Sequence, residues 1–229
     1  MKKESKFLYY VQLLDSALPA GTFSFTFGLN EFIKGRRISE EDELIRSIDA
    51  WIRSSLFFTE GLVVKGMLEA LNDSDMKRFY RYGEWIYLQR MSFHSDEPEH
   101  QMGKKYIKLA KTIYPWMDLK EMEQFTRMYS AGTLPAVHAF TAHRLGISSN
   151  QAMRSYLYTL AHMMVNSALR QIPVMLAEEN KIMSKLMPSI LETMEKAETR
   201  KPEQLFSSAQ VQRYAAETMN HQAYTRLLS

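Results

Sequence analysis

Apolar side chains recur at helical spacing along nearly the whole of this chain. Residues three and four apart share one face of an α-helix, so such a run predicts an amphipathic helix. The clearest run consists of Leu44, Ile48, Trp51, Ile52 and Leu56. No two alternating apolar segments are joined by a two-residue Asn-Gly or Asp-Gly turn, so the pattern does not predict a β-hairpin. We therefore expect an all-α protein.

Capping residues and prolines mark where the individual helices should begin and end. Ser39 and Asp42 have the form of a capping box, in which a hydroxyl and an acid three residues apart accept hydrogen bonds from free N–H groups. Proline suits the first turn of a helix and ends one elsewhere. The other expected boundaries are Asp73, Pro98, Pro115, Asp118, Ser148, Pro173 and Ser208. At the usual helix length, these boundaries predict about ten helices.

The 229 residues are expected to form a single compact domain spanning 1–229. The composition, 45% hydrophobic and 24% charged, is that of a folded globular protein. The polar stretch 192–204 leaves about 25 residues beyond it, fewer than the roughly 40 that an independent domain needs. We expect residues 1–6 to be a flexible N-terminus. Residues 221–229 stay aromatic, basic and apolar to the last position, which predicts a tail that binds a partner.

Composition and spacing exclude several classes of protein. Without cysteine there is no disulfide, no thiolate metal site and no cysteine nucleophile. A net charge of +3 is too small to predict a nucleic-acid groove. No uncharged stretch reaches the ~20 residues of a membrane span, and no signal peptide is recognised, so we expect a cytoplasmic protein. Phosphate-loop, nucleophile-elbow and His-Glu-x-x-His spacings are also absent.

The residues alone leave two alternatives open. One is a helical enzyme or cofactor-binding protein with His138 or His162 in a central pocket, although His162 lies in an apolar stretch and suits a hydrogen-bonded core position better. The other is a nucleic-acid binder, since four lysines form a short basic stripe, a spacing more often typical of a solvated helix face. The four lysines are Lys104, Lys105, Lys108 and Lys111. His94 and His100, with acids between them, are interpreted as part of a solvated loop rather than a metal site.

Three segments depart from an ordinary helix pattern and are the candidate partner-binding regions. In residues 19–29, aromatic residues alternate with hydroxyl residues between glycines. Around residues 170–173, a guanidinium interrupts an apolar helix, where it should find an acidic or carbonyl partner. The third segment is the tail. The candidate residues are Pro19, Gly21, Phe23, Ser24, Gly28, Leu29, Arg170, Pro173, His221, Tyr224, Arg226 and Leu227.

Taken together, these segments resemble the UreF family of urease accessory proteins. The likeness runs in the expected order from residue 13 to residue 229 and so covers essentially the whole chain. The similar stretches are Leu13–Ser24 followed by Gly28-Leu29, Gln101–Lys104, Leu134–Val137, Leu145–Ser148, Ser167–Pro173, Met219–His221, and Tyr224–Leu227 with Ser229.

The resemblance implies a helical scaffold that forms a homodimer rather than an enzyme. Such a protein binds UreD (called UreH in some organisms) and recruits the GTPase UreG, and the assembly delivers nickel to the urease apoprotein. Nickel and GTP would be handled by these partners, with no cofactor bound directly and with neither nucleic acid nor membrane as a partner. By the same resemblance, the tail would order against UreD, Arg170 would engage UreG, and residues 19–29 would shape the partner-facing surface.

Overall fold

A computed structural model of the chain describes residues 3–14, 40–91, 97–128, 133–171 and 179–206. Within these ranges it contains nine α-helices, one 3-10 helix and no strand, which confirms the all-α prediction there. In chain order the elements are α1 (Lys3–Leu13), α3 (Glu41–Ile52), α4 (Ser55–Asn72), α5 (Met76–Met91), α6 (Glu97–Ile113), α7 (Lys120–Met128), α8 (Leu134–Leu145), α9 (Ser149–Gln171), α10 (Glu179–Thr199) and η3 (Pro202–Phe206). Helix α1 starts inside the stretch 1–6 that was expected to be flexible.

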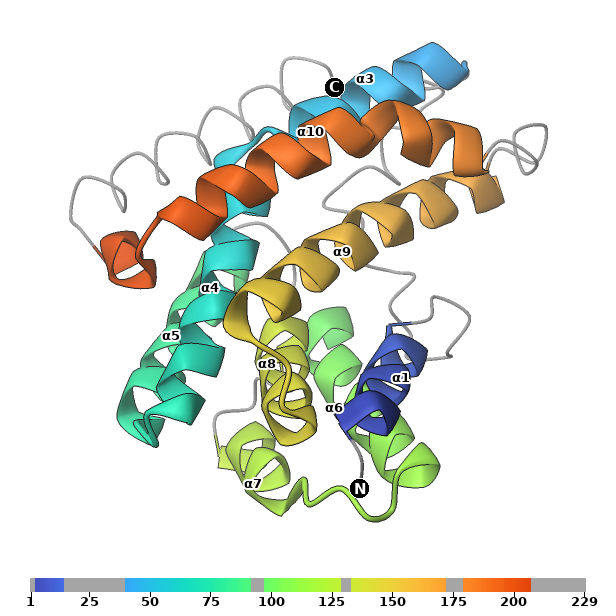
Figure 1. Cartoon of the computed structure of the whole chain (residues 1–229). Coiled ribbons are helices and arrows are strands. Elements are labelled where there is room, and N and C mark those ends of the chain that lie inside the picture. Colours follow the sequence, from blue (N-terminus) through green and yellow to red (C-terminus); the bar gives the residue numbers. More distant parts are fainter. Residues whose placement is uncertain (1–2, 15–39, 92–96, 129–132, 172–178, 207–229) are drawn as a thin grey trace.

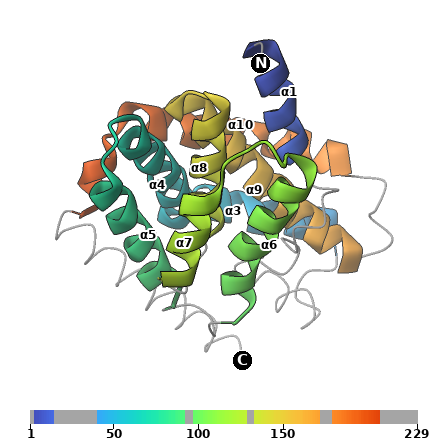
Figure 2. The same cartoon turned by 90° about the horizontal axis from the view of Figure 1, so that it is seen from below.

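Helix α4 forms the centre of the molecule and packs against α5, α8 and α9 (Figure 1). Its middle is buried on all sides, as the consecutive residues Leu62, Val63 and Val64 show. A helix that is apolar all round is stable only inside a core. Helix α10 crosses α9 and lies beside α3, while α1, α6, α7 and α8 form the opposite end of the molecule (Figures 1 and 2). None of the helices in the described ranges is long and apolar enough to span a membrane.

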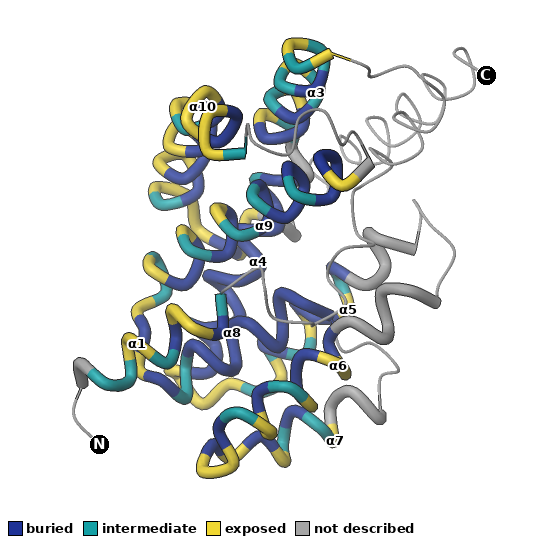
Figure 3. The backbone as a smooth tube through the Cα atoms, turned by 90° about the vertical axis from the view of Figure 1, so that its right-hand side faces the viewer, coloured by how far each residue is buried: buried dark blue, intermediate teal, exposed yellow. Residues whose placement is uncertain are grey.

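Burial follows this layering, with α4 dark blue along most of its length and α10 exposed along one side (Figure 3). On α10, Ile182, Leu186 and Ile190 are fully buried and recur at helical spacing. The apolar stripe of this helix is thus its inner face.

Two contacts fix the end of the described chain on α4. The buried Lys65 ammonium donates to the carbonyl oxygens of Glu198 at 2.8 Å and of Arg200 at 3.1 Å, which lack helical partners at the end of α10. A β-carbon at Gly66 would lie 2.5 Å from the Tyr82 ring and 2.7 Å from Pro202, so only glycine lets η3 approach this closely. The described chain therefore ends in a segment that is held against α4.

Two of the predicted helix starts are confirmed. The Ser148 hydroxyl accepts a hydrogen bond from the Gln151 backbone N–H at 3.3 Å, which caps α9. The Asp118 carboxylate accepts one from the Lys120 N–H at 3.1 Å, at the start of α7. Short polar side chains before an apolar run thus identified these ends correctly.

Two other predicted starts differ from the structure. The N-cap of α3 is Glu40, whose side chain makes no capping hydrogen bond, and Ser39 lies outside the described residues. Helix α5 is capped by Asp75, whose carboxylate accepts from the Arg78 N–H at 2.9 Å, instead of by the Asp73-Ser74 pair. The reason is that Asp73 still belongs to the end of α4, and the left-handed Ser74, with φ of 57°, makes the turn.

A buried polar cluster joins α1 to α8 and α9. The Tyr10 hydroxyl lies 3.0 Å from His138 Nε2 and also hydrogen bonds with Ser155. The same His138 nitrogen lies 3.0 Å from the carbonyl oxygen of Ala152. Burial lowers the pKa of His138 to about 4, so the ring is neutral near pH 7. His138 is thus a packed core residue that helps hold α1, and its contacts do not fit the central cofactor pocket considered as an alternative.

The neutral state of His138 predicts a pH dependence of stability. Its pKa is about 4 in the folded chain against an ordinary 6.5, so its contribution is present above pH 6.5 and is lost as the pH falls toward 4. Chemical denaturation should show the free energy of unfolding falling by about 2 kcal/mol from this residue between about pH 7 and about pH 5. The His138→Gln variant should lack this component, and an unchanged slope in that variant would contradict the assignment.

Candidate functional site

Of the candidate residues from the sequence, Arg170 is the one that the structure describes. It stands exposed in the last turn of α9. The structure therefore tests the surroundings of Arg170 and not how the three candidate segments meet. Outside the described residues lie Pro19, Gly21, Phe23, Ser24, Gly28, Leu29, Pro173, His221, Tyr224, Arg226 and Leu227.

Arg170 ends a row of accessible side chains along α9. Residues four apart lie on one side of a helix, and here they are Tyr158, His162, Asn166 and Arg170. Between residues 156 and 169, all residues outside this row are buried except Thr159. Helix α9 is therefore a core helix that meets the surface along this row.

His162 connects this row to the start of α10. Its Nε2 lies 2.5 Å from the Glu179 carboxylate, and its ring stacks on Tyr158 with 6.0 Å between ring centroids and 13° between planes. The side chain is partly exposed, so the predicted core position of His162 is wrong. The row of four explains why, since the apolar neighbours of His162 in the sequence point to the other side of the helix.

Glu41, the first residue of α3, lies at the same end of the molecule. Its carboxylate accepts hydrogen bonds from Lys181 at 3.0 Å and Lys185 at 2.6 Å, both near the start of α10. Hydrogen bonds from Lys185 and Lys181 lower the pKa of Glu41. The carboxylate therefore stays charged, and the ion pairs persist, at a pH below that at which a glutamate is usually protonated. The starts of α3 and α10 are thus joined to each other, at the end of the molecule where α9 also ends (Figure 1). We call Glu41, His162, Arg170, Glu179, Lys181 and Lys185 the Arg170 corner.

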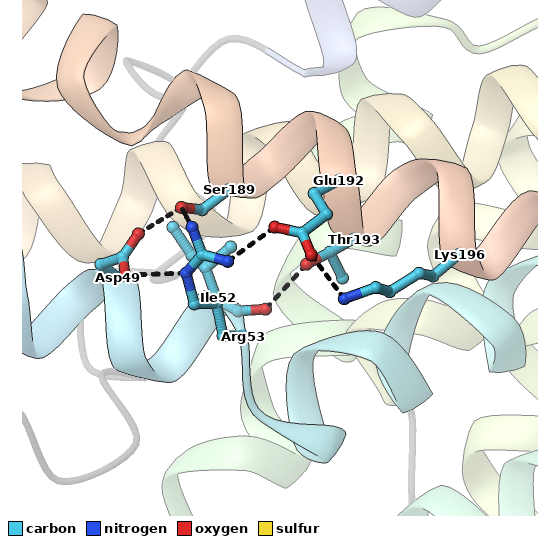
Figure 4. A network of polar contacts seen from close by, with 7 residues as sticks. All are labelled: Asp49, Ile52, Arg53, Ser189, Glu192, Thr193 and Lys196. Carbon is cyan, nitrogen blue, oxygen red and sulfur yellow. Dashed lines mark hydrogen bonds and ion pairs between the residues drawn. The ribbon is translucent and has the colours of Figure 1, made fainter.

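A polar network extends this contact along α3 and α10 (Figure 4). The Arg53 guanidinium donates to Asp49 at 2.9 Å, to Glu192 at 2.6 Å and to the Ser189 hydroxyl at 2.7 Å. The buried Thr193 hydroxyl donates to the carbonyl oxygen of Ile52 at 3.1 Å. Ser189 follows Pro188, an interior proline that removes one helical hydrogen bond, so side chains of α3 brace α10 where its own ladder is interrupted.

The chemistry that this arrangement offers is recognition by charge and shape. The described residues contain no group of three or more His, Asp or Glu side chains placed to hold a metal ion. His94 lies outside those residues, and the His100 side chain is not described. What the Arg170 corner presents is a set of cations and carboxylates on three helix ends, together with the accessible row of α9.

Comparison with known proteins identifies the family of this chain. The sequence model of the UreF family matches residues 38–187, well over half of the chain. The chain belongs to the UreF family. The matched stretch begins before α3, runs into α10 and includes Arg170.

Individual relatives match over most of their length. The urease accessory protein UreF of Bacillus sp. (strain TB-90) is 27% identical over 82% of this chain and 83% of its own. The protein of the same name from Geobacillus kaustophilus (strain HTA426) is 25% identical over 90% of both chains. That of Lachnoclostridium phytofermentans is 28% identical over 73% of this chain and 74% of its own.

The residues that build the Arg170 corner around Arg170 were missed by the sequence reasoning. Glu41, Lys181 and Lys185 were not singled out, because their pairing joins positions 140 and 144 residues apart. A usable signal was the acidic first turn of α3 opposite two lysines on the polar side of α10. Only the packing of α3 on α10 turns those separate signals into a contact.

Replacing Glu41 by glutamine should loosen the Arg170 corner locally. Exposed ion pairs contribute little to global stability but can hold two helix ends together. We therefore expect faster amide hydrogen exchange in the first turns of α3 and α10, with the melting temperature nearly unchanged. The matched control is Asp42→Asn, because Asp42 is mostly exposed and its contact with Lys185 is long, at 3.8 Å. Equal exchange in Glu41→Gln and wild type would contradict a holding role for Glu41.

Proposed function

We propose that this protein is a urease accessory scaffold that binds UreD (or UreH), recruits and regulates the GTPase UreG, and so supports nickel insertion into the urease apoprotein. The observation that carries the proposal is membership of the UreF family across residues 38–187, with relatives named as urease accessory proteins. In this role the chain is not an enzyme. Nickel and GTP are handled by its partners in the cytoplasm.

The Arg170 corner supports a role in partner recognition. An exposed guanidinium at a helix end can form bidentate contacts with a carboxylate or phosphate group of a partner. His162 with Glu179, and Glu41 with Lys181 and Lys185, fix the neighbouring helix ends around it. Because less ordering is then needed on binding, a surface fixed in advance binds more tightly. We assign the contact with UreG to this corner.

The homodimer belongs to the same proposal, and the accessible row of α9 supports it. Tyr158 is a large aromatic side chain that remains exposed while most of its helix is buried. Exposed aromatic residues on a rigid helix are typical of protein interfaces. A second copy of the chain is the partner that we assign to the Tyr158 end of this row, and the Arg170 end is the part that we assign to UreG.

Removal of the tail tests the contact with UreD. Deleting residues 221–229 should abolish co-purification of UreD, because the tail supplies His221, Tyr224 and Arg226 for that contact. The melting temperature should stay close to that of the full chain, since the described core ends at residue 206. A full-length chain with Gln222→Ala serves as the control. Undiminished capture of UreD by the truncated chain would overturn this assignment.

Substitution of Arg170 tests the contact with UreG. Arg170→Ala should weaken UreG binding roughly tenfold, about 1.4 kcal/mol, and should lower urease activation in a reconstituted system. Arg46→Ala, at an exposed position of α3, is the matched control. Arg170→Lys separates two roles, since a lysine that restores binding but not GTP hydrolysis would place Arg170 in regulation of the GTPase. Full activation with normal nickel content in Arg170→Ala would remove Arg170 from the proposal.

A further inference from the structure

The end of α10 is held by side chains from two other helices. The Lys65 ammonium of α4 donates to the carbonyl oxygens of Glu198 at 2.8 Å and of Arg200 at 3.1 Å. Arg154 of α9 forms an ion pair with the Glu198 carboxylate. Lys65 is buried, so its ammonium has lost most of its contact with water and depends on these oxygens. The last turn of α10 is therefore fixed by tertiary contacts.

The short helix η3 follows directly and packs where a glycine leaves room for it. At Gly66, a β-carbon would lie 2.5 Å from the Tyr82 ring of α5 and 2.7 Å from Pro202, the first residue of η3. Tyr82 and Pro202 are both buried. A larger residue at position 66 would push η3 away from α4. We call the residues that make these contacts the η3 anchor, namely Lys65, Gly66, Tyr82, Arg154, Glu198, Arg200 and Pro202.

The η3 anchor is more than is needed to end a helix. Helix α8 ends by local means, because the left-handed Gly146, with φ of 69°, donates its N–H to carbonyl oxygens of the same helix. Ending α10 with a buried ammonium instead requires the desolvation of a charge. A segment at the edge of a packed core is usually poorly ordered unless it is tied down. What the anchor provides in addition is a fixed position for residues 198–206.

We propose that Lys65 and Gly66 are positioning residues for the contact between the tail and UreD. They fix the point at which the chain leaves the core toward residues 221–229, and they act through η3 rather than by touching UreD. The inference rests on the proposed function for the identity of the partner. It adds that UreD meets the core beside η3 as well as the tail, since the starting point of the tail matters only to a partner that contacts both.

A fixed starting point strengthens binding because less freedom is lost on association. The nine residues 198–206 are already ordered in the unbound protein. Without the anchor they would be free, and they would have to be ordered again when UreD contacts the tail and the core together. A variant that loosens η3 should therefore bind UreD more weakly, although every side chain that touches UreD is unchanged.

Gly66→Ala loosens the anchor, and Gly61→Ala is its matched control. Both glycines are buried on α4. A β-carbon at Gly61 would lie 2.8 Å from the Leu157 side chain of α9, so this substitution also strains the core but leaves η3 in place. Hydrogen exchange should show faster opening of residues 198–206 in Gly66→Ala alone. The melting temperature measures the general loss of stability in each variant.

A second variant keeps all contacts of the anchor and separates the tail from them. About twenty Gly and Ser residues inserted between residues 206 and 207 form a flexible link to the tail. The same insertion ahead of Met1 is the control. The described core ends at residue 206, so the insertion there leaves the packing of the core unchanged. This pair tests the proposal even where Gly66→Ala does not fold.

The measurement is biolayer interferometry of each full-length variant against purified UreD and purified UreG. Gly66→Ala should weaken UreD binding about tenfold and leave UreG binding unchanged, while Gly61→Ala should bind both as wild type does. The insertion after residue 206 should weaken UreD binding roughly threefold, because the advantage of a second contact falls as the flexible link lengthens. The insertion ahead of Met1 should have no effect.

The opposite results separate this inference from the proposed function. Equal UreD binding in Gly66→Ala and Gly61→Ala, or wild-type binding after the insertion at residue 206, would overturn the positioning role and leave the tail contact intact. An equal loss of UreD and UreG binding in Gly66→Ala would also overturn it, because that result marks a general defect of the fold. If the chain without residues 221–229 still captures UreD, the proposed tail contact fails and this inference fails with it.

Discussion

The burial of α4 on all sides is the constraint on which the other helices depend. A helix without a polar side must be surrounded, and here α5, α8, α9 and η3 surround it. Two residues of its surface, Lys65 and Gly66, serve the same arrangement. Lys65 closes the end of α10, and Gly66 admits η3. The position of α10, and with it the Arg170 corner, is thus set from the centre of the molecule outward.

Helix type and several helix ends could be predicted from the sequence because they are local properties. Apolar spacing identified the buried face of α3, and Ser148 and Asp118 identified two starts through capping within three residues. The start of α5 was misplaced by two residues, since Ser74 adopts a left-handed conformation that its residue type does not favour. The end of a helix is thus predictable when the capping side chain acts on its own helix.

The candidate site was predictable to a smaller extent. Arg170 was identified because a cation in an apolar run is unusual, and the structure places it on the surface. Its surroundings depend on pairs such as Glu41 with Lys185, whose partners are chosen by tertiary packing and leave no local signal. His162 shows the same limit. An apolar neighbourhood in sequence predicted a buried ring, whereas the helical row places it beside Glu179. The lysines of α6 were correctly interpreted as a solvated helix face, since all four are exposed.

The fixing of η3 on α4 has a consequence for how weak contacts can act together. The chain beyond residue 206 starts from an anchored point, and a fully extended stretch of its length reaches no farther than about 80 Å. A partner held by the proposed tail contact would therefore be confined to a small volume around the core. Within that volume its effective concentration is high, so a second contact to the same core can be occupied even when its own affinity is low. An assembly built in this way can hold several proteins at once and still exchange each of them.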